Sequence, residues 1–309
     1  MSLIRPLTPP LARPDPAPGE GRALHLHFGS PGTGLGAPTI AIPHLAGLDR
    51  ESLGGRGLDF GYEVEPVAEG QLEAATFALY QRLLRRAAGR HLCRVWNYVP
   101  AINGSTGQPP LENYRRFCRA RAQSFEAEWG AAFTARLPAA SAVGGEPGRL
   151  LVVFATSEAV PIALENPEQV PAYEYPIEHG PRPPSFSRAL RVRGTDREWV
   201  FISGTAAIKG HHTVAPGQLQ PQIDCMLHNL ALIGLAAQVG DDLGAAQGWH
   251  RSFKVYLRQA EDLPIARQHL QEQLLREPDE TVWLQADICR SDLVIEVEAT
   301  LHRPLTPVS

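Results

Sequence analysis

The pattern of apolar and polar positions divides the chain into two similar series of helices and strands. In the first series, apolar residues recur at helical spacing over 71–84 and again over 112–129. Runs rich in β-branched and aromatic residues predict strands at 91–100 and 149–156. The inward stripe of the second predicted helix consists of Tyr114, Phe117, Cys118 and Phe125.

The second half of the chain repeats this order of elements. A strand is predicted at 201–208 and a helix at 222–235, followed by a strand that begins at Arg251. The next helix is predicted to begin at Pro264, because proline is tolerated in the first turn of a helix. Two closing strands are predicted at 281–288 and 293–300.

The two series align when RVWNYVP is placed over KVYLRQA, which pairs Arg94 with Lys254 at an offset of 160 residues. A repeat of this length indicates two copies of one module and not a solenoid. Each copy should carry helices on one face of a mixed sheet, so the predicted fold class is α/β (α+β). We expect an N-terminal arm at 1–40, a first module with its connecting segment at 41–190, and a second module at 191–309.

The connecting segment at 167–189 is rich in proline, and its simplest interpretation is a linker. It nevertheless contains Tyr173, Tyr175, Phe186 and Arg188, which are costly side chains to leave on a tether in solvent. We therefore expect this segment to pack on the modules and to cover a pocket.

Composition narrows the classes of function. Hydrophobic residues make up 43% and charged residues 20% of the 309 positions, which is typical of a globular protein. A net charge of −4 provides no basic field for nucleic acid, and no apolar run approaches the roughly 18 residues that cross a membrane. The proline-rich N-terminus has no apolar signal core, so we expect a mobile or surface-draped arm and a cytoplasmic protein.

Two glutamates in LVIEVEAT are candidates for acid chemistry. Alternation along a strand places Glu296 and Glu298 on one face, with Leu293, Ile295 and Val297 on the other. If that face meets solvent, both are ordinary surface carboxylates. If it lines a cleft, burial would raise the pKa of one glutamate and make it a general acid near neutrality.

Arginines near the predicted strands are candidates for binding an anion, although most arginines lie at surfaces. Arg188, Arg191 and Arg193 precede the strand at 201–208, and Arg258 ends KVYLR. A carboxylate ligand would need two or three of them, because the planar guanidinium matches a carboxylate bidentately.

Cysteines and histidines suggest no metal. The four cysteines form no CxxC pair, and Cys289 lacks the nearby histidine that would indicate a Cys–His nucleophile. His211 and His212 should face opposite sides of a strand, with no acidic or histidine partner at ligand spacing. In contrast, the small residues that end the strand in FISGTAAI predict that another group approaches the backbone there.

Four segments together resemble the chorismatase family: RVWNYVPAINGSTGQPPLENYRRFCRARAQSFE, FISGTAAIKGHHTVAPG, 222–229 and QADICRSDLVIEVEA. The resemblance covers roughly residues 60–303 and leaves the N-terminal arm outside. That family shares its fold with the reactive-intermediate deaminase (Rid) superfamily, so the resemblance implies two fused Rid-like, chorismate-mutase-like modules. Rid deaminases bind a carboxylate through an arginine on the strand before the last, and TVWLQAD has none, which counts against imine deamination.

The resemblance implies an enzyme without metal or organic cofactor that cleaves chorismate and releases pyruvate. Glu296 matches the family's catalytic glutamate, which would protonate the enolpyruvyl methylene carbon. A cysteine at the position of Cys289 is similar to the hydroxybenzoate-forming subtypes, so 3-hydroxybenzoate is the expected second product, with 4-hydroxybenzoate as an additional candidate. Gly204, Thr205 and Ala206 would be small so that the substrate ring can lie against the strand. The expected substrate-binding residues are Tyr98, Tyr173, Arg188, Gly204, Thr205, Ala206, Gln222 and Arg258.

Three alternatives remain open at this point. A hydrolytic chorismatase would use the same acid and release a trans-dihydroxycyclohexadiene carboxylate with pyruvate. A Rid-like protein would bind or deaminate a small carboxylate. A structural interaction protein would leave Tyr98, Arg188, Arg258 and Glu296 far apart. The expected partner is a small molecule, with no nucleic acid and no membrane, and the resemblance to Rid modules favours a homotrimer.

Overall fold

The computed structural model describes residues 5–6, 24–27, 39–42 and 57–305, the first three segments by their backbone alone. Two main sheets and four helices carry the architecture of this part of the chain. The elements of the first half are β4 (Leu58–Pro66), α2 (Leu72–Arg86), β5 (His91–Pro100), β6 (Ser105–Thr106), β7 (Leu111–Glu112), α3 (Asn113–Trp129), β8 (Ala139–Gly145) and β9 (Arg149–Ser157). Those that follow are β10 (Ile162–Leu164), β11 (Ala189–Arg193), β12 (Arg197–Thr205), β13 (Ile208–Lys209), β14 (His212–Thr213), α4 (Leu219–Ala236), β15 (His250–Leu257), α5 (Leu263–Gln273), β16 (Glu280–Gln285) and β17 (Ile295–Pro304).

The two sheets contain the same unit, which confirms the internal repeat. The first sheet has the order β4-β9-β5-β8, and the second contains β12-β17-β15-β16 within seven strands. In the first unit, β5 is parallel to β8 and antiparallel to β9. In the second unit, β15 is parallel to β16 and antiparallel to β17 in the same way. The mixed sheets confirm the predicted α/β class. The domain boundaries stay predictions, and β10 pairs with β11 in the second sheet.

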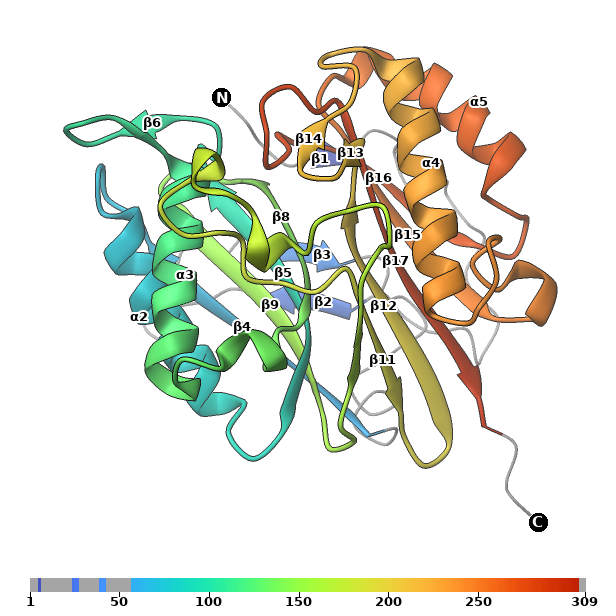
Figure 1. The fold of residues 1–309 in the computed structure, drawn as a ribbon, viewed down its shortest axis with the longest axis horizontal. Coiled ribbons are helices and arrows are strands. Elements are labelled where there is room, and N and C mark those ends of the chain that lie inside the picture. Colours follow the sequence, from blue (N-terminus) through green and yellow to red (C-terminus); the bar gives the residue numbers. More distant parts are fainter. Residues whose placement is uncertain (1–4, 7–23, 28–38, 43–56, 306–309) are drawn as a thin grey trace.

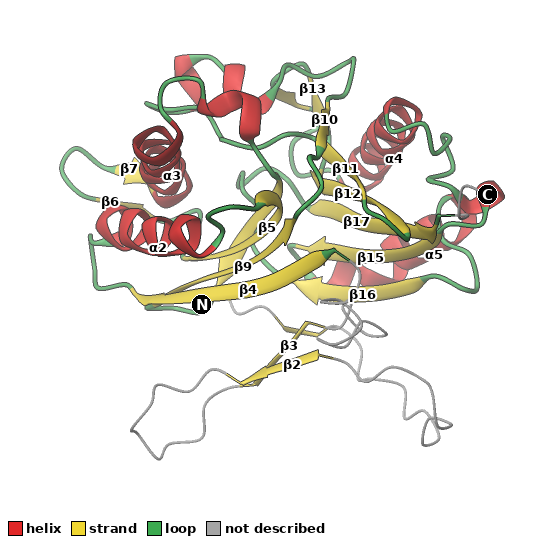
Figure 2. Ribbon diagram, turned by 90° about the horizontal axis from the view of Figure 1, so that it is seen from below, coloured by secondary structure: helices red, strands yellow, loops and turns green. Residues whose placement is uncertain are grey.

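The sheets lie between two layers of helices, and each sheet has helices on one face (Figures 1 and 2). Alternating side chains of β5 explain this arrangement, because Val95 and Val99 pack under α2 and α3 whereas Trp96 and Tyr98 face the other sheet. On the second sheet, Val297 and its alternate neighbours pack under α4 and α5. The face that bears Glu296 and Glu298 is therefore turned toward the first half of the chain.

Predicted and observed elements agree closely where the hydrophobic pattern is long. Helices α2 and α3 begin one residue after their predicted starts, whereas α4 begins at Leu219, three residues before the predicted start. Among the longer strands, β4, β8 and β11 were not predicted from the sequence. Strand β8 is composed of alanine, serine, valine and glycine and lacks the bulky residues that mark a strand. A Cβ at Gly145 would lie 2.7 Å from the carbonyl carbon of Tyr98, so small residues allow this edge to pack closely.

Little of the N-terminal arm can be compared with the prediction. Strand β1 (Arg5–Pro6) pairs with β16 at the edge of the large sheet, and β2 (Leu24–His27) pairs with β3 (Thr39–Ile42). The rest of the predicted arm lies outside the described residues. Within the part of the chain that is described, no helix is long and apolar enough to cross a membrane.

Candidate active site

A cavity of about 420 Å³ opens where the two halves meet. The connecting segment forms one wall of it, through Tyr175, His179, Phe186 and Arg188, which confirms that this segment packs over a pocket. In Figure 1 the segment crosses the front of the molecule between the two halves. The opposite wall comes from the end of β12 and from the loop that leads into β17, and it includes Gly204, Ala206, Cys289, Arg290 and Glu296.

Glu296 lies in the wall of this cavity as a buried acid. Glu296 is 3% exposed, and its Oε1 atom has no hydrogen-bond partner among the described residues. Burial, and then the nearby charge of Glu298, raise the pKa of Glu296 to about 8, against opposing effects of Arg94 and Arg188. The surface interpretation of this strand face is thus excluded, and Glu296 carries a proton at neutral pH.

Glu298, on the same face, has the opposite character. Its carboxylate accepts hydrogen bonds from Arg94 Nη2 at 2.7 Å and Trp96 Nε1 at 2.7 Å, and it accepts another from the Ser141 hydroxyl. Lys254 Nζ lies 2.8 Å from Oε1. Burial alone would raise the pKa of Glu298, but Lys254 and Arg94 outweigh it and hold the pKa below its usual value. Two adjacent glutamates therefore carry different protonation states, which is a common arrangement at sites of acid chemistry.

Gly204 is small at the point where the strand approaches the acid. A Cβ at this position would lie 2.1 Å from Glu296 Oε1 and 3.2 Å from Ser141 Cβ. The missing side chain leaves room for the carboxyl group of Glu296. Gly204 and Ala206 also line the cavity, so the expectation that a substrate ring lies against this strand end stays a prediction. Gly204 also lies at the irregularity where the register between β12 and β17 shifts, between Ile202 and Thr205.

Gly204→Ala is expected to displace the acid. The added methyl group forces the carboxyl of Glu296 to move, so we expect kcat to fall at least tenfold, at a stability cost of roughly 1–3 kcal/mol for overpacking. Steady-state kinetics and thermal unfolding measure the two effects. Gly61→Ala is the matched control, because its Cβ would lie 2.4 Å from the ring of Phe154, away from the cavity. Equal losses of activity in both variants would contradict the assigned role of Gly204.

Three arginines line the cavity, together with the acidic Glu112, Glu178 and Asp292. Arg188 donates from Nη2 to the hydroxyl of Tyr175 at 2.6 Å, and its Nε has no partner among the described residues. Arg290 donates to the carbonyl of His211 at 3.0 Å and stacks over Tyr175. Arg115 lies at the rim. Arg188 was predicted from the sequence. Arg290 and Arg115 were missed, because the sequence alone does not distinguish them from arginines at the protein surface.

Cys289 also lines the cavity, and burial followed by the charge of Glu296 raises its pKa well above the ordinary value. The thiol is therefore protonated at neutral pH and is a poor nucleophile. It also lines a smaller pocket of about 30 Å³ beside Glu296, together with Tyr114, Ser141, Phe186 and Arg121. Cys289 thus lies where the large cavity and the small pocket join.

Five predicted binding residues do not line this cavity. The Tyr98 hydroxyl accepts a hydrogen bond from Lys254 at 3.2 Å between the sheets. Tyr173 packs at the edge of the hydrophobic core that lies beneath α2 and α3. The Thr205 hydroxyl donates a hydrogen bond to the carbonyl of Ser203, so it points toward its own backbone. Gln222 bridges the carbonyls of Ala215 and Asp292 and the amide of Val294.

Arg258 is the fifth of these residues, and it holds a loop. Its guanidinium donates five hydrogen bonds, to the carbonyls of Leu293, Ile288 and Arg290 and to the side chains of Asn103 and Asp287. No N–H group is left for a carboxylate ligand in this arrangement. Arg258 instead fixes the loop that presents Cys289 and Arg290 to the cavity.

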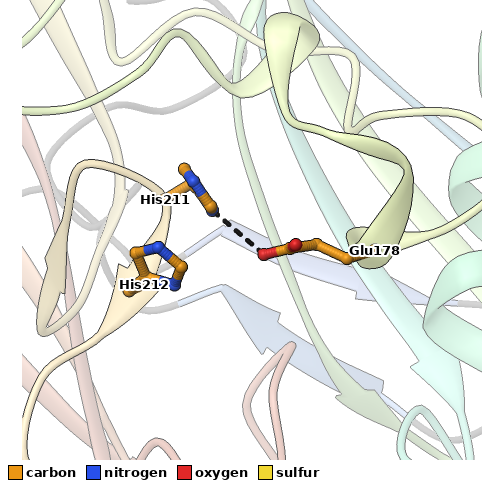
Figure 3. A group of neighbouring side chains, drawn as sticks. All are labelled: Glu178, His211 and His212. Carbon is orange, nitrogen blue, oxygen red and sulfur yellow. Dashed lines mark ion pairs between the residues drawn. The ribbon is translucent and has the colours of Figure 1, made fainter.

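A cluster of histidines with one glutamate, drawn in part in Figure 3, includes residues that line the cavity. Ligand atoms of Glu178, His211 and His212 lie within 4.8 Å of one another, and His179 Nε2 is 2.9 Å from His211 Nδ1. The connecting segment supplies Glu178 and His179, which sequence spacing did not reveal as partners. This donor set suits a transition metal, although Arg290 adds a repelling charge near His179. The expectation that the protein binds no metal remains a prediction.

Comparisons with known proteins all point in one direction. A family model described as chorismatase FkbO/Hyg5-like, N-terminal, matches residues 57–156. A 3-hydroxybenzoate synthase of Streptomyces hygroscopicus is 37% identical over 243 residues, which are 75% of this chain and 70% of that protein. A chorismatase of Streptomyces rapamycinicus is 36% identical over 254 residues, which are 79% of this chain and 75% of that one. A crystal structure of a chorismatase is 33% identical with a TM-score of 0.69, covering 78% of this chain and 74% of its own.

Proposed function

The chain belongs to the chorismatase family, and on that premise we propose that it cleaves chorismate to pyruvate and 3-hydroxybenzoate. The observation that carries this proposal is the buried Glu296, whose Oε1 has no hydrogen-bond partner among the described residues, in the wall of a cavity that also bears arginines. Chorismate is a dicarboxylate with an enolpyruvyl ether, so it needs both a proton donor and cations. The cavity offers both within one concave site.

Glu296 is assigned the role of general acid. An enol ether is unreactive until its methylene carbon is protonated, and a pKa near 8 keeps the proton available at neutral pH. Proton transfer produces an oxocarbenium ion, which the site must then allow a nucleophile to capture.

The ring 4-hydroxyl is assigned the role of internal nucleophile. Its oxygen replaces the ether oxygen at the neighbouring ring carbon, pyruvate leaves, and the hydroxyl proton is released. The arene-oxide-like species then isomerises to the aromatic hydroxybenzoate. Together the two products have the atoms of chorismate, so the reaction consumes no water, oxidant or reductant.

The substrate carboxylates are assigned to the arginines of the cavity. Arg188 and Arg290 both lie near the Tyr175 ring, each within 6 Å of its centroid, and together they form the cationic side of the large cavity. Guanidinium groups held by packing and hydrogen bonds bind a carboxylate with little loss of conformational entropy. We assign the ring carboxylate of chorismate to this side.

Incubation of the purified protein with chorismate tests the proposal directly. Chromatography and mass spectrometry should identify pyruvate and 3-hydroxybenzoate in equal amounts. A dihydroxycyclohexadiene carboxylate with pyruvate would instead make the enzyme hydrolytic. Absence of pyruvate above the spontaneous background would overturn the assignment of a chorismate-cleaving activity.

Cys289→Ala is expected to change the product ratio more than the rate. The thiol lies where the cavity and the small pocket join, so its removal opens space at the bond that breaks and admits water. We expect the hydrolytic product to rise severalfold, measured by chromatography after full conversion. Cys93→Ala is the control, because Cys93 is equally small but lies between the sheets and donates to the carbonyl of Ala155. An unchanged ratio in Cys289→Ala would remove this residue from the partitioning step.

A further inference from the structure

Side chains with metal-binding atoms meet beside the cavity from two segments that are far apart in the sequence. They are Glu178, His179, His211 and His212, here called the histidine cluster. The first two belong to the connecting segment, whereas His211 lies in the turn between β13 and β14 and His212 begins β14. Figure 3 shows the carboxyl group of Glu178 directed toward His211, with His212 beside it. The cluster therefore joins the connecting segment to the second half of the chain.

Three of its ligand atoms form a triangle of the size that a metal ion requires. His179 Nε2 lies 2.9 Å from His211 Nδ1. Glu178 Oε1 lies 3.5 Å from His179 Nε2 and 3.4 Å from His211 Nδ1. A tetrahedral Zn²⁺ ion with metal–ligand bonds of about 2.0–2.1 Å separates its ligand atoms by about 3.3–3.4 Å. One ion can thus contact all three atoms after only small shifts of the side chains.

His212 is available as the fourth ligand. One of its ligand atoms lies within 4.8 Å of the ligand atoms of Glu178 and His211. Its side chain is exposed, so it can rotate toward an ion without disturbing the core. One carboxylate and three imidazoles suit Zn²⁺ and the neighbouring divalent transition metals, whereas Mg²⁺ and Ca²⁺ prefer oxygen ligands alone.

The charges around the cluster weaken a bound cation without excluding it. Arg290 donates to the carbonyl of His211 and to the hydroxyl of Thr213, so its positive charge lies close by. Glu178 supplies a negative charge within the cluster, and Asp292 lines the same cavity. We therefore expect a dissociation constant on the order of micromolar, weaker than that of a structural zinc site.

We propose that the histidine cluster is a binding site for a divalent transition metal, with Zn²⁺ as the best fit. This inference goes beyond the proposed function, in which the acid chemistry belongs to Glu296. The sequence analysis expected no metal because no partner lies at ligand spacing from His211 and His212. The fold supplies these partners by placing Glu178 and His179 of the connecting segment beside the β13–β14 turn.

A bound ion would attach the connecting segment to this turn at a second point. The two are already joined at the start of the segment, where Gly210 exchanges backbone hydrogen bonds with Glu168 and Val170. An ion on the cluster fixes the stretch between these two points, which carries Tyr175 in the cavity wall. Because Glu178 and His179 also line the cavity, the ion narrows it and slows the exchange of substrate. The ion thus acts as an inhibitor and not as a cofactor.

Titration of the full chain, without a histidine tag, with Co²⁺ and Zn²⁺ tests the site independently of turnover. Tetrahedral Co²⁺ has a strong visible absorption band that the hydrated ion lacks. We expect one equivalent of Co²⁺ to produce this band and Zn²⁺ to abolish it by displacement. Glu178→Gln and His211→Asn should each weaken Co²⁺ binding at least tenfold. His250→Asn is the matched control, because His250 stacks on His302 with ring centroids 4.9 Å apart and should leave the band unchanged.

Turnover of chorismate tests the attachment of the segment. Saturating Zn²⁺ should lower kcat/KM at least threefold in the wild type and in His250→Asn, a chelator should restore it, and Glu178→Gln should not respond. No visible band with excess Co²⁺, or an equal band in Glu178→Gln and His211→Asn, would overturn the metal site. A band at the cluster with unchanged kcat/KM would overturn the inhibitory role. If chorismate is not cleaved but Co²⁺ binding depends on Glu178 and His211, the metal site stands and the proposed activity fails.

Discussion

Glu296→Gln is expected to lower kcat for chorismate by roughly a hundred- to ten-thousandfold, the range that a positioned general acid contributes. The amide has the shape of the carboxyl group but cannot donate a proton to carbon, so substrate binding should change only a few-fold. Single-turnover assays with excess enzyme measure the chemical step directly. Normal turnover in this variant would place the acid elsewhere in the cavity.

The raised pKa of Glu296 predicts how the activity and the stability of the wild type depend on pH. Because the pKa of Glu296 is raised to about 8, activity that needs its proton should decline above that pH. For stability, a carboxyl whose folded pKa is raised contributes fully below its unfolded pKa, and this contribution is lost as pH rises through the folded value. The wild type should therefore lose Tm between about pH 5 and pH 9 relative to Glu296→Gln, which carries no ionisable group there.

Glu298→Gln is expected to destabilise the protein by about 3–5 kcal/mol. Arg94 and Lys254 are each 1% exposed, and both are paired with this one carboxylate. A neutral amide would leave two cations buried between the sheets without a counter-charge. Chemical denaturation measures the loss, and because the pKa of Glu298 is held low, the wild type should lose the same contribution only as pH falls through that low value.

Glu198→Gln is the matched control for this prediction. Glu198 is also buried and its pKa is also lowered, by Arg191 and Arg303 acting against burial. The side chains of these two arginines are 18% and 36% exposed, so they can be hydrated when their partner is lost. We expect a smaller cost than at Glu298 and little change in activity. Equal costs at the two positions would show that burial of the cations is not what makes Glu298 important.

Local rules of the sequence were sufficient for much of the fold. Alternation of side chains along a strand placed Glu296 and Glu298 on one face, and the structure confirms it with both residues buried. The repeat alignment paired Arg94 with Lys254, and these two side chains meet at the same carboxylate. Both inferences hold because they depend on the period of a strand and on the order of elements, which a single sequence records.

Which residues form the site depends on distances between segments that are far apart in the sequence, and no local sequence rule gives these distances. Tyr98 and Arg258 were both expected to bind the substrate, and the 160-residue offset of the repeat relates them. Tyr98 is still within β5, however, whereas Arg258 lies one residue beyond β15 and reaches a loop. Arg121 was overlooked although it has the spacing of the buried stripe formed by Phe117, Cys118 and Phe125. A charged residue on an otherwise apolar helical stripe was the available signal, because such a position is buried whatever its side chain.

The shared carboxylate between the halves has a consequence for anyone who recombines this protein with its relatives. One carboxylate from the second half is paired with one cation from each half, so this ion cluster belongs to neither half alone. A chimera that exchanges one half must therefore carry Arg94, Lys254 and Glu298 as a compatible set. Hybrids that mismatch the set are expected to accumulate as insoluble protein, which the soluble yield of a small panel of such hybrids would measure.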